Sequence, residues 1–204
     1  MYIALTFDDG YKEQLYIARY LARHGIKATF FIITGLKYYI GKELLEPSEV
    51  REIYRLGHEI GSHTVTHINM INVDRDTMHR ELVESKKTLE DIINDTVHSF
   101  AYPFGPHSDE AAAIARSIYQ VVRGVYLGSA KYYTLFDEHG CILAFNLRLS
   151  NIYEILRMRR FDSIALFTHM PSLAKLGLLL RALSILKPKY VTLRELADII
   201  SIAK

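Results

Sequence analysis

Residues 2 to 10 read Tyr2-Ile3-Ala4-Leu5-Thr6-Phe7-Asp8-Asp9-Gly10, and they begin a pattern that recurs along the chain. Strand-forming residues run directly into two carboxylates and a glycine, as when a buried strand ends in a polar turn. A helical pattern follows, with Leu15, Ala18 and Leu21 on one face, and Gly25 ends the helix just past its last turn. A strand, a helix and a glycine stop therefore form one unit.

The same unit recurs along the chain. We expect further strands over 28–33, 58–62, 99–102, 120–126, 163–168 and 190–191, with helices between them and no regular element over 127–150. Repeated strand–helix units imply a mostly parallel sheet with right-handed crossovers, and a closed barrel buries roughly seven such strands economically. We therefore expect an α/β fold, a small barrel in a single domain over 1–204.

Composition and charge exclude several classes of protein. Lys and Arg number 25 against 23 Asp and Glu, a balance too mild for a nucleic-acid partner. No apolar run reaches the roughly 18 residues of a membrane span. Met1 leads into the first strand without a basic leader, and Cys141 is the single cysteine, so we expect a cytoplasmic protein. Cys141 is expected to be a small buried apolar group rather than a reactive thiol.

Two adjacent carboxylates, Asp8 and Asp9, end the first strand. Neighbouring carboxylates repel each other, so the pair becomes favourable if one binds a cation and the other stays free to take a proton. The alternative is an Asp-Gly turn in which one carboxylate caps the next helix.

Two histidines, His63 and His67, follow the third expected strand. In an extended chain their Cα atoms would lie roughly 13 Å apart, too far to share a metal. Coiled into one turn they would lie about 6 Å apart, and neutral imidazoles with one carboxylate suit Zn²⁺. The alternative is that both histidines cap or pack.

Two further strands also end in unusual residues. Tyr102-Pro103-Phe104-Gly105 follows the fourth strand, and such a Pro-Gly loop can direct a backbone N–H at a ligand. The apolar strand from Ile164 ends in His169, for which a buried core histidine is the alternative. Catalytic groups of barrels of this kind lie at the carboxyl ends of the strands, where all these residues are expected.

In this order, the four segments resemble the polysaccharide deacetylases, the NodB-homology group of carbohydrate esterase family 4. The family's first motif, T-F-D-D-G, stands intact at 6–10 and its second, H-[ST]-x-x-H, at 63–67. Residues 27–31 and 191–193 extend the resemblance over almost the whole chain. It implies a distorted (β/α)7 barrel, a divalent metal, usually Zn²⁺ with Co²⁺ or another ion as alternatives, and hydrolysis of an acetamido group on a sugar.

The resemblance also implies roles for single residues. Asp9, His63 and His67 match the metal ligands, and Asp8 matches the general base. Phe104 holds the position whose backbone N–H stabilises the oxyanion, with Tyr102 beside it in the substrate loop. His169 matches the general acid that protonates the departing amine.

The chain departs from the family pattern in two places. The third motif commonly begins with an arginine that pairs with the base, and Ala101 stands there instead. Arg123 and Arg148 are the candidates to replace it, and a solvated surface arginine is the alternative for each. The fourth motif, an Asp-Trp pair, has no counterpart, because the chain contains no tryptophan.

These observations predict a metal-dependent deacetylase acting on an N-acetylglucosamine-containing oligosaccharide or polysaccharide. The alternatives are a related amidohydrolase on a small amide and a carbohydrate-binding pseudoenzyme. The expected partner is a carbohydrate, with no nucleic acid and no membrane span, and the oligomeric state stays open. Two tyrosine pairs at 38–39 and 132–133 are expected to pack, with stacking on sugar rings as the alternative. His107 is expected to be structural, with a place in the cleft as the alternative.

Overall fold

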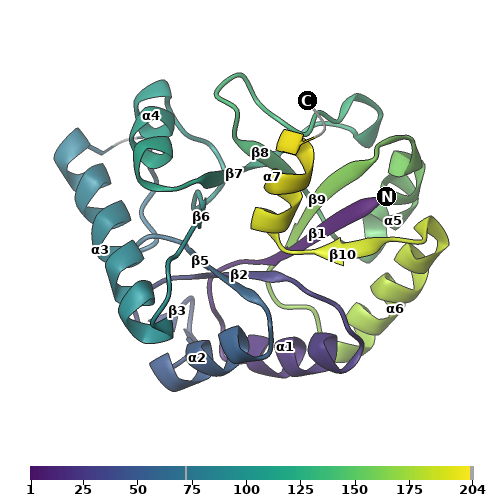
Figure 1. Cartoon of the computed structure of the whole chain (residues 1–204), viewed down its shortest axis with the longest axis horizontal. Coiled ribbons are helices and arrows are strands. Elements are labelled where there is room, and N and C mark those ends of the chain that lie inside the picture. Colours follow the sequence, from purple (N-terminus) through teal and green to yellow (C-terminus); the bar gives the residue numbers. More distant parts are fainter. Residues whose placement is uncertain (72, 203–204) are drawn as a thin grey trace.

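Seven parallel strands close into a barrel in the computed structural model, which describes residues 1–71 and 73–202 (Figure 1). The ring runs in the order β1-β2-β5-β6-β7-β8-β9, and β9 returns to pair with β1. The fold is therefore the expected (β/α)7 barrel. The bounds of the ring strands are β1 Tyr2–Phe7, β2 Thr29–Ile32, β5 Glu59–Ser62, β6 Ser99–Ala101, β7 Val121–Tyr126, β8 Ile142–Asn146 and β9 Ser163–Thr168.

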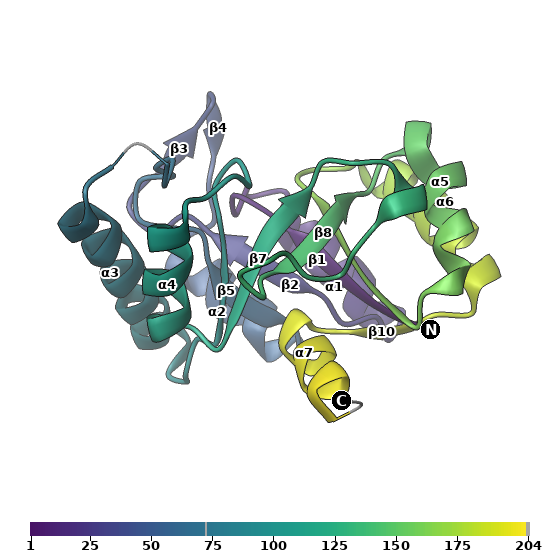
Figure 2. The ribbon, with the colours of Figure 1, turned by 90° about the horizontal axis from the view of Figure 1, so that it is seen from above.

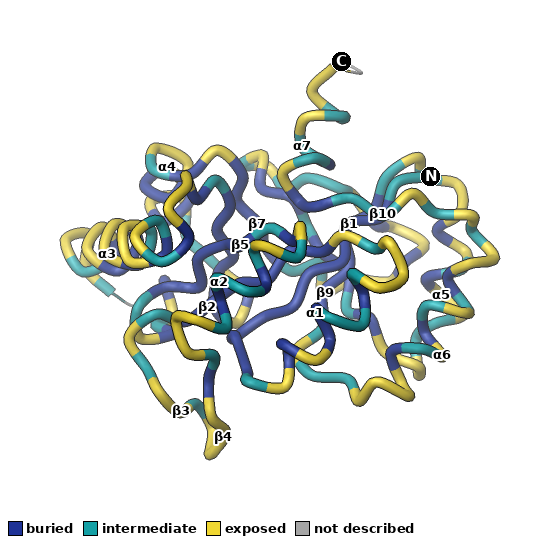
Figure 3. The backbone as a smooth tube through the Cα atoms, turned by 60° about the horizontal axis from the view of Figure 1, so that its bottom comes forward, coloured by how far each residue is buried: buried dark blue, intermediate teal, exposed yellow. Residues whose placement is uncertain are grey.

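Helices cover the outside of the ring, and the tube in Figure 3 shows buried strands inside helices whose outer faces are exposed. A large apolar core lies between the two layers. No helix of the described residues is long and apolar enough to cross a membrane. The α-helices are α1 Gln14–Arg23, α2 Pro47–Arg55, α3 Arg75–Ile93, α4 Asp109–Ile118, α5 Ile152–Arg157, α6 Leu173–Leu183 and α7 Leu193–Ile202, and short 3-10 turns span Ala130–Tyr132, Leu149–Asn151, Met158–Arg160 and Ser184–Leu186.

The predicted number of seven strands in the barrel is correct, but one of the segments predicted to form them is wrong. The segment expected to lack a regular element contains β8, whose Ile-Leu-Ala-Phe run pairs with β7 and β9. The expected last strand forms β10 (Lys189–Val191), which pairs only with the first half of β1 and stays outside the ring. Because β10 is three residues long, its apolar pattern resembles that of a ring strand although it only extends one edge.

The amino end of the barrel is closed by α7. Leu193 and Leu196 pack against alanine and phenylalanine side chains that fill the interior of the ring. The Leu193 N–H donates to the hydroxyl of Thr29, and the Arg194 N–H donates to the Glu59 carboxylate, both at strand starts. With this end filled, only the carboxyl ends of the strands remain for a site.

A short hairpin rises beside those carboxyl ends. β3 (Tyr38–Tyr39) and β4 (Lys42–Glu43) form an antiparallel pair, and Figure 2 shows it projecting from the body of the molecule. An isolated bridge from Tyr11 to Leu44 ties the hairpin to the loop after β1. The hairpin therefore forms one wall of the open end.

Candidate active site

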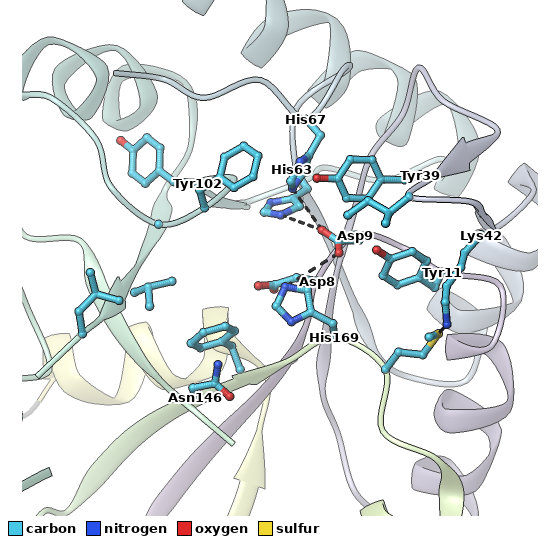
Figure 4. Close-up of a pocket in the computed structure, with 17 residues that line it drawn as sticks. Asp8, Asp9, Tyr11, Tyr39, Lys42, His63, His67, Tyr102, Asn146 and His169 are labelled. Atoms are coloured by element: carbon cyan, nitrogen blue, oxygen red, sulfur yellow. Dashed lines mark hydrogen bonds and ion pairs between the residues drawn. The ribbon is translucent and has the colours of Figure 1, made fainter. Parts of the chain in front are cut away.

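Three side chains with metal-binding atoms meet at the carboxyl end of the barrel. The Asp9 Oδ1 atom lies 3.5 Å from Nε2 of His63 and 3.2 Å from Nε2 of His67 (Figure 4). Nδ1 of His63 lies 2.8 Å from the Ala101 carbonyl, and a carbonyl only accepts, so Nδ1 carries the proton and Nε2 presents its lone pair. The two predicted histidines and the predicted carboxylate thus come together.

Left-handed backbone shapes these loops. Asp9 and Gly10 both have φ of 77°, so the chain turns sharply after β1 and brings the Asp9 carboxylate over the barrel. Thr64 (φ 66°) and His67 (φ 59°) fold the second motif back on itself, and the two imidazole centroids lie 5.0 Å apart. The predicted compaction of the histidine pair is therefore confirmed, through a loop rather than a helical turn.

Glu81 on α3 holds the loop between the two histidines. Its carboxylate accepts hydrogen bonds from Val65 N at 2.8 Å, from Thr66 N at 2.9 Å and from the Thr66 hydroxyl at 2.8 Å. This buried residue was not predicted from the sequence. It could have been found as a carboxylate on the same face of α3 as the buried Met78 and Leu82, where a charged side chain needs partners.

The base expected at Asp8 is paired with Arg123. Nη2 of Arg123 lies 2.6 Å from Asp8 Oδ1, and the arginine is completely buried. Its guanidinium lies over the rings of Phe31 and Phe167, at 5.1 and 5.3 Å from their centroids. Arg123 therefore supplies the charge that the third motif lacks.

The strand register explains why Arg123 can take the place of an arginine at position 101. Arg123 on β7 is the register partner of Ala101 on β6, the position where the family arginine is missing. Register partners on adjacent parallel strands project to the same face of the sheet. Arg148 does not take this role, because it is exposed and lies outside the pocket. The expectation for Arg148 is therefore corrected in favour of its alternative, a solvated surface arginine.

The loop after β6 presents a free backbone donor. Phe104 has φ of 63° and lines the pocket, and among the described residues no group accepts a hydrogen bond from its N–H. Tyr102 lies beneath the loop, but its hydroxyl donates to the Ala111 carbonyl at 3.2 Å, away from the pocket. The expected part of Tyr102 in substrate binding therefore does not involve its hydroxyl.

His169 follows β9 on the opposite side of the carboxylates. Its side chain is 47% exposed, and its Nε2 lies 3.9 Å from Asp9 Oδ2, so the alternative of a buried core histidine is wrong. Gln14, completely buried on α1, donates to the backbone carbonyls of both Asp8 and His169. Gln14 thereby joins the ends of β1 and β9, and sequence reasoning missed it although it is a polar residue on the apolar face of α1.

These groups surround one cavity of about 580 Å³. Aromatic and apolar side chains form its walls, with Tyr39 and Ile40 from the β3–β4 hairpin and Val125 and Leu127 on the side of β7. Tyr39 therefore belongs to the site, whereas Tyr133 packs in the core with its hydroxyl bonded to the Leu143 carbonyl. The remaining lining residues are Tyr11, Lys42, Gly105, Asn146, Phe167 and Met170.

The donor set fits a divalent metal ion. One ligand atom from each of Asp9, His63 and His67 lies within 4.8 Å of the other two. Oδ1 of Asp9 is fully enclosed and has no hydrogen-bond partner among residues 1–71 and 73–202, and a bound cation would offset the free energy that such burial costs. Burial would raise the pKa of Asp9, but without a cation the N–H groups of the two imidazoles would face the carboxylate and hold this pKa well below its ordinary value, so the carboxylate is ionised. Two imidazoles and one carboxylate are a common zinc donor set with room for further ligands.

The comparisons with known proteins agree with this geometry. The family model described as "Polysaccharide deacetylase" matches residues 1–121. The chain therefore belongs to the polysaccharide deacetylase family.

Individual relatives differ in how much they share with the chain. It is 35% identical over 112 residues to a gellan lyase of a Bacillus species, covering 54% of this chain and 4% of that protein. It is 30% identical over 125 residues to a peptidoglycan-N-acetylglucosamine deacetylase of Bacillus cereus, covering 59% and 54%. A mutant of a Bacillus anthracis carbohydrate esterase family 4 pseudoenzyme, with restored enzymatic activity, has a similar fold, with a TM-score of 0.71, 20% identity and coverage of 96% and 66%. The matches thus span at most about half of these two curated relatives.

Proposed function

We propose that the protein is a metal-dependent hydrolase that removes N-acetyl groups from an oligosaccharide or polysaccharide containing N-acetylglucosamine. The observation that carries the proposal is that four kinds of chemical group needed for this reaction line one cavity. A metal-binding trio, a paired carboxylate, a free backbone N–H and an exposed histidine all line it. Family membership and the similarity to a deacetylase of peptidoglycan support the same reaction.

A divalent ion held by Asp9, His63 and His67 would act as a Lewis acid toward the acetyl carbonyl and lower the pKa of water. Asp8 is placed to take the proton of the attacking water, and its ion pair with Arg123 holds this carboxylate in position. The Phe104 N–H is free to donate to the oxyanion that forms. When the carbon–nitrogen bond breaks, His169 gives a proton to the amine, so acetate and a free amino sugar leave.

The walls of the cavity suit a sugar substrate. Tyr39 lies beside the metal-binding His67, with ring centroids 4.4 Å apart, and Phe104 is 58% exposed on another side of the same imidazole. Exposed aromatic faces pack well against the apolar faces of sugar rings. Val125 and Leu127 form another part of the wall, and the chain has no counterpart of the family's Asp-Trp pair, so we expect selectivity for the sugar or chain length to differ from that of other members.

Acetate release tests the proposal. The substrates are N-acetylglucosamine oligomers of increasing length, peptidoglycan fragments and small acetamides, each incubated with the zinc-loaded protein. We expect the oligomers or peptidoglycan to be hydrolysed and Asp8→Asn at matched zinc content to be about 100-fold slower or worse. Turnover confined to small acetamides would favour the amidohydrolase. Glycan binding without acetate release at any zinc loading would favour the pseudoenzyme and contradict the proposal.

A further inference from the structure

A second group of metal-binding side chains lies outside the cavity described above. We infer that His107, Asp137 and Cys141 form a second site for a divalent ion, of the zinc class. Among residues 1–71 and 73–202, two groups offer three ligand atoms within 4.8 Å of one another, the active-site trio and this one. Cys141 is completely buried, and the side chains of His107 and Asp137 are only 9% and 11% exposed.

The other polar atoms of these residues are already occupied. Nδ1 of His107 lies 3.1 Å from the Gly105 carbonyl, so Nδ1 donates and Nε2 presents a lone pair. Oδ1 of Asp137 accepts from the backbone N–H groups of His139 and Cys141, at 3.0 and 2.8 Å. Oδ2 of Asp137 is enclosed and accepts no hydrogen bond from any described residue, although His107 Nε2 lies 3.2 Å away. Two buried lone pairs that face each other need a cation or a proton between them.

The arrangement repeats that of the active-site histidine. In both His63 and His107, Nδ1 is fixed by a backbone carbonyl and Nε2 faces a buried carboxylate oxygen. Metal-binding histidines usually carry such an outer hydrogen bond, because it fixes the tautomer and the ring orientation. One nitrogen, one oxygen and one sulfur donor suit zinc, with water as the fourth ligand. Cys141 would bind as a thiolate, so binding would release one proton.

The second site would tie the substrate loop to the barrel. The His107 ring stacks on Tyr102, with centroids 4.2 Å apart and planes 8° from parallel, and both residues flank Phe104 in sequence. Asp137 and Cys141 belong to a tight turn in which the Asp137 N–H donates to the Cys141 carbonyl just before β8. An ion shared by the two segments would therefore hold the loop that carries the Phe104 N–H. The inference does not depend on the proposed deacetylase activity.

Metal binding tests the inference without an activity assay. Metal-free protein carrying H63Q and H67Q, which removes two of the three active-site ligands, is titrated with Co²⁺ while the near-ultraviolet thiolate-to-cobalt band is recorded. Zinc content after loading is measured on the same protein and on wild type. We expect two zinc ions per wild-type chain, one in the H63Q/H67Q protein, and a thiolate band that is lost on adding Cys141→Ser.

Two further variants sharpen the result. Asp137→Asn keeps the oxygen that holds the turn while weakening the ligand, so it should reduce cobalt affinity and leave the protein folded. His79→Gln, at an exposed position of α3 away from the cluster, is the matched control and should keep the band. A single zinc per wild-type chain, with no thiolate band in the H63Q/H67Q protein, would overturn the inference and leave an imidazolium–carboxylate pair in its place.

Discussion

Arg123 reaches Asp8 across the barrel interior, with Nη2 2.6 Å from Oδ1 and both side chains buried. The same arginine pairs in register with Ala101, where the family's third motif commonly places its arginine. This chain therefore supplies the guanidinium from β7, one strand away from Ala101, and pairs it with Asp8. The ion pair holds the Asp8 carboxylate at the carboxyl end of the barrel, in the place where a general base is needed.

Transferring the arginine from position 123 to position 101 tests directly whether Asp8 needs its ion pair. Arg123→Ala leaves Asp8 as a buried charge without its partner, which costs about 3–5 kcal/mol of folding free energy. We expect a loss of acetate release of about 100-fold or more. Adding Ala101→Arg to Arg123→Ala places a guanidinium on the neighbouring strand, in the space that Arg123 vacates, and should restore part of both losses.

The control for this series is Arg148→Ala, because Arg148 is exposed and outside the cavity. Its rate and stability should stay within the error of wild type. Full activity in Arg123→Ala, measured at wild-type zinc content, would show that Asp8 needs no partner.

Glu81 should control metal affinity from a distance. Its carboxylate accepts three hydrogen bonds from residues 65 and 66, between His63 and His67. Glu81→Ala frees this loop, and we expect zinc to bind about 10–100-fold more weakly to the active site, as measured by competition with a chelator. Glu81→Gln keeps one acceptor oxygen and should recover much of the affinity. Equal affinity in all three proteins would show that the loop holds its shape without Glu81.

His58 should make folding sensitive to acid. Its Nε2 lies 2.9 Å from the buried Ala18 carbonyl, and burial lowers the pKa of this imidazole below its ordinary value of 6.5. The folded state therefore favours the neutral ring, whose contribution is complete above pH 6.5 and is lost as the pH falls below that value. In His58→Gln the amide can still donate but does not titrate. We expect the free energy of unfolding to fall less steeply for the variant between pH 7 and pH 5, as measured by urea denaturation. Parallel curves would contradict this assignment.

The features of the fold that depend on local sequence pattern could be predicted from the sequence. The strand-to-turn stretch at residues 2–10 and the apolar periodicity fixed the class of fold, because alternating strands and helices leave few ways to bury their faces. β8 was not predicted because the segment before it, residues 127–141, forms a 3-10 turn and irregular structure in place of the α-helix that separates the other ring strands. β10 was misplaced because three residues cannot show whether a strand closes a ring or extends an edge.

The site was predictable only where a motif is local. Asp9 lies in one short motif and His63 and His67 lie in another, and each motif follows a strand that the pattern predicts. The contact between Asp8 and Arg123 instead depends on the register of β6 against β7, which sequence alone does not reveal. Glu81 and Gln14 act through buried hydrogen bonds to backbone atoms of other segments, so only the packing of α3 and α1 exposes their roles. The single-domain extent and the cytoplasmic location stay predictions.

Measuring whether acetate release depends on zinc is the most direct test that this chain is a metal-dependent deacetylase. Metal-free protein is titrated with Zn²⁺ while the rate of acetate release from N-acetylglucosamine oligomers is recorded, with His67→Gln as the matched variant. We expect the rate of acetate release to rise from background to a plateau in wild type and to stay at background in His67→Gln. The same rate before and after zinc addition, or an equally active His67→Gln protein, would contradict it.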